Sequence, residues 1–384
     1  MSDPYAGLYL HVPFCARVCP YCDFAVRTGD AARRHRFTAA LIDEIRLQPR
    51  FPRPFDTIYF GGGTPSQLES GHLERIRDAL RAQFDFAEPT RIYLEANPED
   101  VTAQAVADWH RLGVSTLSLG VQALDPPALA FLGRSHDPDG ARRAVERARA
   151  GGFETVSIDL IYGLPGQTAD AWRQELDRAL ALGVDHLSCY QLTIHEGTRF
   201  GLLARRGQLV ESDGDRQGEL FRLTHRHLAS GGMPGYEASQ FARSAAHRSR
   251  HNTKYWNHTP YLGLGPSAHS FCERRRWWNL RRTDPYEAAV FAGRLPVEDR
   301  EILDPAALAL EALMTGLRTY AGVDLAEIRQ RCGIDLLPEN HALLERFAAQ
   351  QLVALDGARV VPTLDGLAVA DGLAREFEIP AILA

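Results

Sequence analysis

The sequence predicts an α/β fold with a parallel sheet, followed by a small winged-helix-like α+β domain. Three observations support this prediction. Short apolar runs alternate with helical patterns, polar and glycine residues follow each run, and three helical patterns precede short strands near the C-terminal end. Six strand–helix units are too few for a closed eight-fold barrel, so we expect an open, partial barrel. A flat doubly wound sheet is the alternative, and periodicity alone leaves it open.

Six apolar runs have the length and the β-branched or aromatic content of strands. They cover residues 8–12, 57–60, 92–94, 116–121, 156–161 and 187–192. Helical periodicity lies between them, at residues 31–47, 68–83, 103–112, 138–150 and 169–182. Strands that alternate with helices at this spacing indicate βα units whose strands pair in parallel.

The repeat fades after about residue 195. A helix is expected at residues 215–229, and strands or extended segments at 236–241, 255–257 and 276–280. Helices are then expected at 306–316, 325–332 and 338–350, followed by short strands at 353–355, 360–362 and 367–370. We therefore divide the chain into a barrel with an extension, residues 1–295, and a C-terminal domain, residues 300–384.

Charge and hydropathy exclude several classes of protein. The formal net charge is −6, and the last 80 or so residues hold no Lys and few Arg, so nucleic acid is not an expected partner. No apolar run reaches the roughly 18 residues that a membrane helix needs. Residues 1–7 are too short and too polar for a secretory signal. We expect a cytoplasmic protein without a membrane span, whose C-terminal domain packs on the barrel or covers it.

Three of the six cysteines, Cys15, Cys19 and Cys22, lie on one short loop. A disulfide framework would spread its cysteines, and zinc sites usually add a second pair of ligands. A zinc site or three unrelated thiols are the alternatives. Three thiolates can hold three irons of a [4Fe–4S] cluster and leave the fourth iron open. The open iron can bind the amino and carboxylate groups of S-adenosylmethionine (SAM). An electron from the cluster can then cleave the sulfonium C–S bond of SAM.

Polar, Gly and Pro residues follow each predicted strand. The segments are 11–15, 61–65, 95–98, 120–122, 162–166 and 191–193. Because parallel strands end at the same edge, and ligands bind there in α/β folds, these segments together favour a site over ordinary turns.

The cysteine loop resembles the signature of the radical SAM superfamily, in which a glycine-rich segment such as residues 61–65 lets the backbone approach SAM. Several stretches resemble the oxygen-independent coproporphyrinogen III oxidase family: residues 9–15 (YLHVPFC), 19–24 (CPYCDF), 61–66 (GGGTPS), 95–98 (EANP), 120–122 (GVQ), 159–165 (DLIYGLP) and 263–269 (GLGPSAH). The resemblance covers essentially the whole chain and implies a partial (β/α)6 barrel.

The same resemblance implies the SAM contacts. They are Tyr9, Tyr21, Gly62, Gly63, Thr64, Glu95, Gln122, Arg134 and Asp159. Whether one or two SAM molecules bind is left open. For Glu95 and Asp159, a buried salt bridge with Arg134 is the alternative. The chain departs from the oxidases at Phe24, where they have a fourth cysteine, and this counts against coproporphyrinogen oxidation.

Residues 251–256 (HNTKYW) resemble the H-N-x-x-Y-W motif of the heme chaperone branch of this family. The resemblance implies heme binding by His251, Asn252, Tyr255 and Trp256, because imidazole ligates heme iron and aromatic rings pack on porphyrins. Without the resemblance, these residues would be assigned to loop bonding and core packing. His247, His258 and His269 are other candidate ligands.

The resemblance therefore implies a heme chaperone that binds a [4Fe–4S] cluster, SAM and heme and passes heme to an acceptor protein. An electron donor such as flavodoxin or ferredoxin is implied as a further partner. The alternatives are a catalytic radical SAM enzyme, such as a coproporphyrinogen oxidase, and a winged-helix regulator with a redox-sensing cluster.

Overall fold

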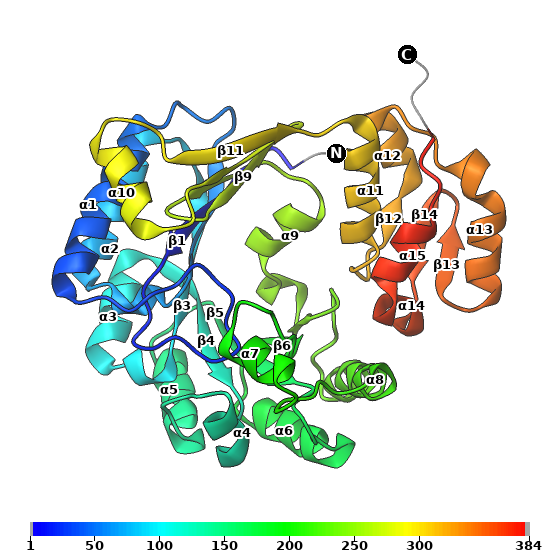
Figure 1. Ribbon diagram of the computed structural model, residues 1–384, viewed down its shortest axis with the longest axis horizontal. Coiled ribbons are helices and arrows are strands. Elements are labelled where there is room, and N and C mark those ends of the chain that lie inside the picture. The colour runs from blue at the N-terminus through cyan, green and yellow to red at the C-terminus, as the bar shows by residue number, and fades with distance from the viewer. Residues whose placement is uncertain (1–2, 381–384) are drawn as a thin grey trace.

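One large curved sheet runs through most of the protein (Figure 1). The computed structural model describes residues 3–380, so residues 1–2 and 381–384, the outermost ends of the two predicted domains, lie outside it. Within the described residues the sheet has eleven strands in the order β11-β10-β9-β8-β1-β2-β3-β4-β5-β6-β7.

The first six strands pair in parallel and in sequence order. They are β1 (Ala6–Val12), β2 (Phe55–Gly62), β3 (Phe86–Ala96), β4 (Val114–Gln122), β5 (Thr155–Tyr162) and β6 (His186–Gln191). A doubly wound sheet reverses its strand order at a switch point, and here the order never reverses. The predicted partial barrel is therefore confirmed, and the flat sheet is excluded.

Helices cover the outer, convex face of this sheet (Figure 1). They are α1 (Ala31–Leu47), α2 (Ser70–Gln83), α3 (Ala103–Leu112), α5 (Pro138–Ala150) and α6 (Ala169–Ala181), whereas the short α4 (Pro126–Phe131) packs on Phe200 in a separate cluster. Alternate strand side chains, such as Leu8 and Leu10 of β1, are buried beneath these helices in the main hydrophobic core. The intervening side chains, such as Tyr9, point to the concave face, which leaves that face free for polar groups.

The sheet continues past the barrel on both sides. Next to β6 lies the short antiparallel β7 (Gln240–Ala242), and β8 (Tyr261–Leu264) pairs in parallel with β1. Beyond β8 follow the antiparallel strands β9 (His269–Cys272), β10 (Arg275–Asn279) and β11 (Val297–Ile302). In the described residues β7 and β11 are the two edges and do not pair, so the barrel stays open.

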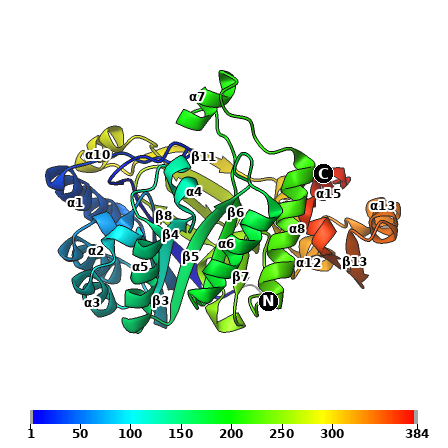
Figure 2. The same cartoon turned by 90° about the horizontal axis from the view of Figure 1, so that it is seen from below.

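Helices of the second half of the barrel region connect these strands. They are α7 (Arg199–Arg205), α8 (Gly214–Ser230), α9 (Arg250–Trp256) and α10 (Thr283–Phe291). Figure 1 shows α9 on the concave side of the sheet. Figure 2 shows α7 projecting from one end of the barrel, where the backbone N–H of Phe200 donates to the Pro20 oxygen at 2.9 Å in the cysteine loop.

Two predicted segments in this region are corrected. Residues 255–257 are not extended: Tyr255 and Trp256 form the last turn of α9, which begins where the Ser249 side chain accepts a bond from the Asn252 N–H. Their β propensity is overridden by this cap and by packing on the sheet. Of residues 236–241, only 240–241 fall in a strand, the short β7, whereas the strand expected at 276–280 is β10.

The C-terminal region has its own hydrophobic core and its own small antiparallel sheet, of order β12-β14-β13. Its helices are α11 (Pro305–Gly316), α12 (Leu325–Cys332), α13 (Leu337–Ala349), α14 (Leu364–Ala368) and α15 (Ala370–Glu376). Its strands are β12 (Val323–Asp324), β13 (Val353–Asp356) and β14 (Arg359–Pro362). This arrangement confirms the winged-helix-like α+β unit, while the division near residues 295–300 stays a prediction.

The strand predicted at residues 367–370 is wrong. That stretch ends α14 and begins α15, because the Thr363 side chain caps α14 by accepting from the Gly366 N–H at 3.1 Å. Among the described residues, no helix combines the length and the apolar character needed to cross a membrane.

Candidate functional site

The cysteine loop is held closed at its base. The Cys15 N–H donates to the Arg27 oxygen at 3.0 Å, and the Arg27 N–H donates to the Pro13 oxygen at 2.7 Å. Beside them Phe14 is fully buried edge-to-face on Phe37, with ring centroids 5.4 Å apart. These bonds fix both ends of the loop, so Cys15, Cys19 and Cys22 stay on one wall of a cavity of about 380 Å³ at the carboxyl ends of the strands.

The three thiols fit a [4Fe–4S] cluster. The guanidinium of Arg134 lies 3.4 Å from the Cys19 sulfur and suits an anionic group, and its buried Nε has no hydrogen-bond partner. Burial raises the pKa of the Cys15 thiol to about 11, so iron must displace its proton on binding. Among the described residues, no three Cys, His, Asp or Glu converge closely enough for a single metal ion.

The glycine-rich turn after β2 is packed against this loop. A Cβ on Gly63 would lie 2.8 Å from the Phe14 oxygen and 3.1 Å from the Cys15 sulfur, so only glycine fits there. Gly62 has a φ of 107°, which also favours glycine. The Thr64 hydroxyl donates to the Cys15 sulfur at 3.4 Å. The turn thereby lines the cavity with backbone rather than with side chains.

Two carboxylates, Glu95 and Asp159, enter the cavity from the concave face. Burial raises the pKa of Glu95 to about 7 and that of Asp159 to about 6. Glu95 accepts from the Tyr59 hydroxyl at 2.7 Å and from the Gly62 N–H at 3.2 Å. Within residues 3–380 neither carboxylate pairs with Arg134, which instead contacts Cys19, Asn97 and Gly120, so the alternative of a buried salt bridge is not what the structure shows. Both are arranged to receive a cationic ligand.

Arg134 and Gln122 complete the strand ends. Arg134 Nη2 donates to Asn97 Oδ1 at 2.6 Å and to the Gly120 oxygen at 2.8 Å. Gln122 adopts a left-handed φ of 68° where the β4 register shifts, and its side chain lines the cavity. Tyr21 of the cysteine loop lines the same cavity and packs on Phe200. Eight of the nine expected SAM residues thus meet in one place.

Tyr9 is the exception. It lines a neighbouring cavity of about 400 Å³, which shares Gly62 and Glu95 with the first. The Tyr9 hydroxyl bonds His11 Nδ1 at 3.1 Å, and His11 Nε2 lies 3.0 Å from the Ala25 oxygen. A carbonyl only accepts, so Nε2 carries the proton and Nδ1 accepts from Tyr9. In this arrangement Tyr9 holds the cysteine loop through His11.

The HNTKYW motif forms α9 and lies on the concave face. His251 is 1% exposed, and its Nδ1 and Nε2 bond the Thr57 hydroxyl at 2.9 Å and the Tyr255 hydroxyl at 2.7 Å. Trp256 packs on Tyr236, and Asn252 donates its backbone N–H to the Ser249 cap. Of the motif residues, Tyr255 alone lines the described cavities that flank α9. Both ring nitrogens of His251 are therefore engaged within the protein.

Some residues of the cavity were not predicted individually. Asn97, Tyr190 and His195 line it as well. Asn97 carried a signal, since it lies in the EANP stretch after β3 and receives the Arg134 bond. Tyr190 and His195 carried none, because a strand-end tyrosine and a loop histidine are common in any α/β protein.

Comparison with known proteins agrees with this geometry. The Radical SAM superfamily profile matches residues 9–179, and the HemN C-terminal domain profile matches residues 303–369. A solved structure of coproporphyrinogen III oxidase (HemN) from Escherichia coli superposes with a TM-score of 0.82. It is 22% identical and covers 97% of this chain and 90% of that one, so it establishes the shared fold. The chain is a radical SAM protein with a HemN-type C-terminal domain.

Full-length relatives narrow this further. Heme chaperone HemW of Mycobacterium tuberculosis is 35% identical over 378 residues, covering 96% of this chain and 94% of the relative. Heme chaperone HemW of Bacillus subtilis is 30% identical over 361 residues, covering 93% and 95%. The chain belongs to the HemW family. Membership of the radical SAM superfamily implies a [4Fe–4S] cluster and SAM as its cofactors.

Proposed function

We propose that the protein is a heme chaperone of the radical SAM type, which binds a [4Fe–4S] cluster, SAM and heme and passes heme to an acceptor protein. The observation that carries the proposal is the place of α9. This helix bears the HNTKYW motif and lies between the cysteine-loop cavity and the C-terminal unit, with Tyr255 on the walls of two cavities. The names of the full-length relatives support the same function.

Each part of the cluster site has a role in this proposal. Cys15, Cys19 and Cys22 hold the cluster, and the backbone at residues 62–64 admits the methionine end of SAM. Glu95 and Asp159 face its cationic groups. When bound, a reduced cluster supplies the electron that cleaves the sulfonium C–S bond of SAM. A flavodoxin or ferredoxin is the class of donor that supplies such an electron.

The test is an anaerobic hemin titration of the cluster-reconstituted protein, followed by Soret absorbance. We expect saturable one-to-one binding that is weaker in His251→Ala. The matched control is His341→Ala, which removes an exposed imidazole from α13. Absence of saturable binding in the unmodified protein would sink the proposal.

A coproporphyrinogen assay separates the chaperone from the enzymatic alternative. Under reducing anaerobic conditions with SAM, the chaperone forms no protoporphyrinogen. Phe24, which stands where the oxidases have a fourth cysteine, is 64% exposed beside the cysteine loop. Turnover of coproporphyrinogen would assign the protein to the oxidases instead.

A further inference from the structure

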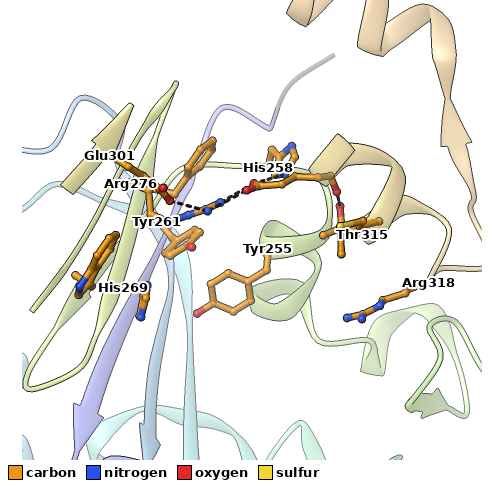
Figure 3. Close-up of a pocket in the computed structure, with 12 residues that line it drawn as sticks. Tyr255, His258, Tyr261, His269, Arg276, Glu301, Thr315 and Arg318 are labelled. Carbon is orange, nitrogen blue, oxygen red and sulfur yellow. Dashed lines mark hydrogen bonds and ion pairs between the residues drawn. The ribbon is translucent and has the colours of Figure 1, made fainter. Parts of the chain in front are cut away.

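A third cavity lies where the barrel meets the C-terminal unit (Figure 3). It measures about 480 Å³, within the range of about 300–1,000 Å³ typical of small-molecule sites. Its walls come from the end of α9, from strands β8 to β11 and from α11. We name it the junction cleft. It shares no lining residue with the cysteine-loop cavity.

The walls of the junction cleft are largely aromatic. Tyr255 meets Tyr261 edge-to-face with ring centroids 4.7 Å apart, and Tyr261 lies 6.2 Å from Phe271 at an angle of 30°. On the same sheet face His269 stacks on Trp278 at 5.6 Å and 25°. Flat rings at these spacings suit a large planar aromatic ligand, because offset and edge-on contacts are the favoured aromatic geometries.

His269 is an imidazole in this cleft with both ring nitrogens free to bind a metal. Its side chain is exposed, and within residues 3–380 neither of its ring nitrogens has a hydrogen-bond partner. Partial burial and the nearby Arg276 lower the pKa of His269, which favours the neutral ring that ligation requires. His258, the second imidazole of the cleft, packs on Phe271, and its Nε2 lies 3.6 Å from Glu311. Its Nδ1 has no hydrogen-bond partner within residues 3–380, but its side chain is only 7% exposed, so His269 is the more accessible of the two.

Arginines lie on the rim, where an anionic ligand edge would be held. Arg318 points toward the cleft in Figure 3 and pairs with Asp371 through two bonds of 2.7 Å. Both partners are about half exposed, so this pair is worth at most about 1 kcal/mol. A ligand carboxylate can replace Asp371 at little cost. Arg276 is held more firmly, by Glu311 and Glu301.

The junction cleft is linked to the cluster site through residues that line neighbouring cavities. It shares Tyr255, Tyr261 and His269 with the middle cavity, and the middle cavity shares Gly62 and Glu95 with the cysteine-loop cavity. A ligand in the cleft would therefore be separated from the cluster site by the middle cavity.

We propose that heme binds in the junction cleft with His269 as its axial ligand, and that His251 is a positioning residue that orients Tyr255. This inference rests on the proposed function and specifies its heme site. Aromatic rings cover the porphyrin faces, and Arg318 receives a propionate. The buried His251 holds the Tyr255 hydroxyl through its hydrogen bond.

The test titrates cluster-reconstituted full-length protein with hemin and, separately, with metal-free protoporphyrin. In His269→Ala we expect hemin affinity to fall by about tenfold, with loss of the histidine-ligated Soret and EPR signature. Protoporphyrin affinity stays within about twofold, since packing is kept, and added imidazole restores the signature. In His251→Ala hemin affinity falls while the histidine signature remains. His341→Ala is the matched control.

A further variant tests the cleft without changing either histidine. Thr315→Trp fills the α11 wall and should block hemin and protoporphyrin alike. Hemin binding that is unchanged in His269→Ala and Thr315→Trp overturns this site and leaves the chaperone proposal standing. Loss of the histidine signature in His251→Ala also overturns it. Absence of hemin binding by the unmodified protein overturns the proposed function itself.

Discussion

Glu95 is a carboxylate whose burial is costly for the folded protein. Its ordinary pKa of 4.5 rises to about 7 on burial, with Asp159 adding to the rise and the Tyr59 bond opposing it. In the range between these two values the folded protein binds the proton more tightly than the unfolded chain does. The free energy of unfolding therefore falls as the pH rises from about 4.5 to about 7. The stability that the protonated Glu95 permits is fully present below about pH 4.5 and is lost as the pH rises through about 7.

Replacing Glu95 by Gln should remove this loss. The amide still accepts from Tyr59 and carries no charge, so the free energy of unfolding at pH 8 should rise by up to roughly 3 kcal/mol. Urea unfolding at pH 5 and pH 8, without SAM, measures the change. The control is Glu345→Gln on the exposed face of α13. If the free energy of unfolding changed between pH 5 and pH 8 by the same amount in the variant as in the unmodified protein, the burial argument would be contradicted.

The same substitution should weaken SAM binding. A buried carboxylate attracts the cationic groups of SAM more strongly than an amide does, so affinity should fall by about tenfold or more at pH 8. Equilibrium dialysis of the cluster-loaded protein measures it. A variant that is more stable and yet binds SAM more weakly indicates that Glu95 is retained for the ligand. Equal SAM affinity in both proteins would assign it a structural role only.

The turn after β2 shows how one element shapes the site. Gly63 lies between the backbone oxygens of Phe14 and Val12 and the Cys15 sulfur, and a Cβ would be 2.8, 2.9 and 3.1 Å from them. Two of these three atoms belong to the backbone, which cannot rotate away. Gly63→Ala should therefore displace the cysteine loop. We expect the free energy of unfolding to fall by about 1–3 kcal/mol and the iron content after reconstitution to be lower.

Iron and sulfide per chain, and the cluster absorbance, measure this effect. The matched control is Gly71→Ala in α2, where a Cβ would meet nothing within 4 Å. That change should be neutral or slightly stabilising, because alanine restricts the unfolded chain. A full iron complement in Gly63→Ala would show that the loop tolerates displacement.

Elements with a clear period could be predicted from the sequence. The βα repeat predicted all six barrel strands, and α1, α3 and α5 end at the expected residues. The failures are short and aromatic: α9 and the α14–α15 stretch hold rings or apolar residues that suit a strand, and a single cap decides for helix. Strands β8, β9 and β11 were missed because β8 and β9 have only four residues each and β11 is polar.

The cluster cavity could be predicted from the sequence, whereas the junction cleft could not. The parallel sheet places every strand end at one edge, so the polar residues after the strands predicted which side chains would meet. The cleft depends on α9, the β8–β11 extension and α11 meeting in space, which no local pattern encodes. The motif predicted His251 among the heme-binding residues, and the fold adds that both of its ring nitrogens are hydrogen-bonded within the protein.

At the scale of the whole molecule, the three cavities form a row from the cysteine loop to the C-terminal unit. If SAM occupies the first and heme the last, both order the residues of the middle one, so each should lower the cost of binding the other. We expect SAM to tighten hemin binding by about fivefold or more and, by thermodynamic reciprocity, hemin to tighten SAM binding by the same factor.

Hemin titrations with and without SAM, and SAM dialysis with and without hemin, measure the two factors. Tyr255→Phe keeps the ring contact with Tyr261 and removes the bond to His251, so it should lower the factor while hemin still binds. Because His251 also lies 5.0 Å from the ring of Tyr59, whose hydroxyl holds Glu95, this bond is the short route between the two ligands. A factor of one in the unmodified protein would mean that the cavities act independently, and that SAM has no part in loading or releasing heme.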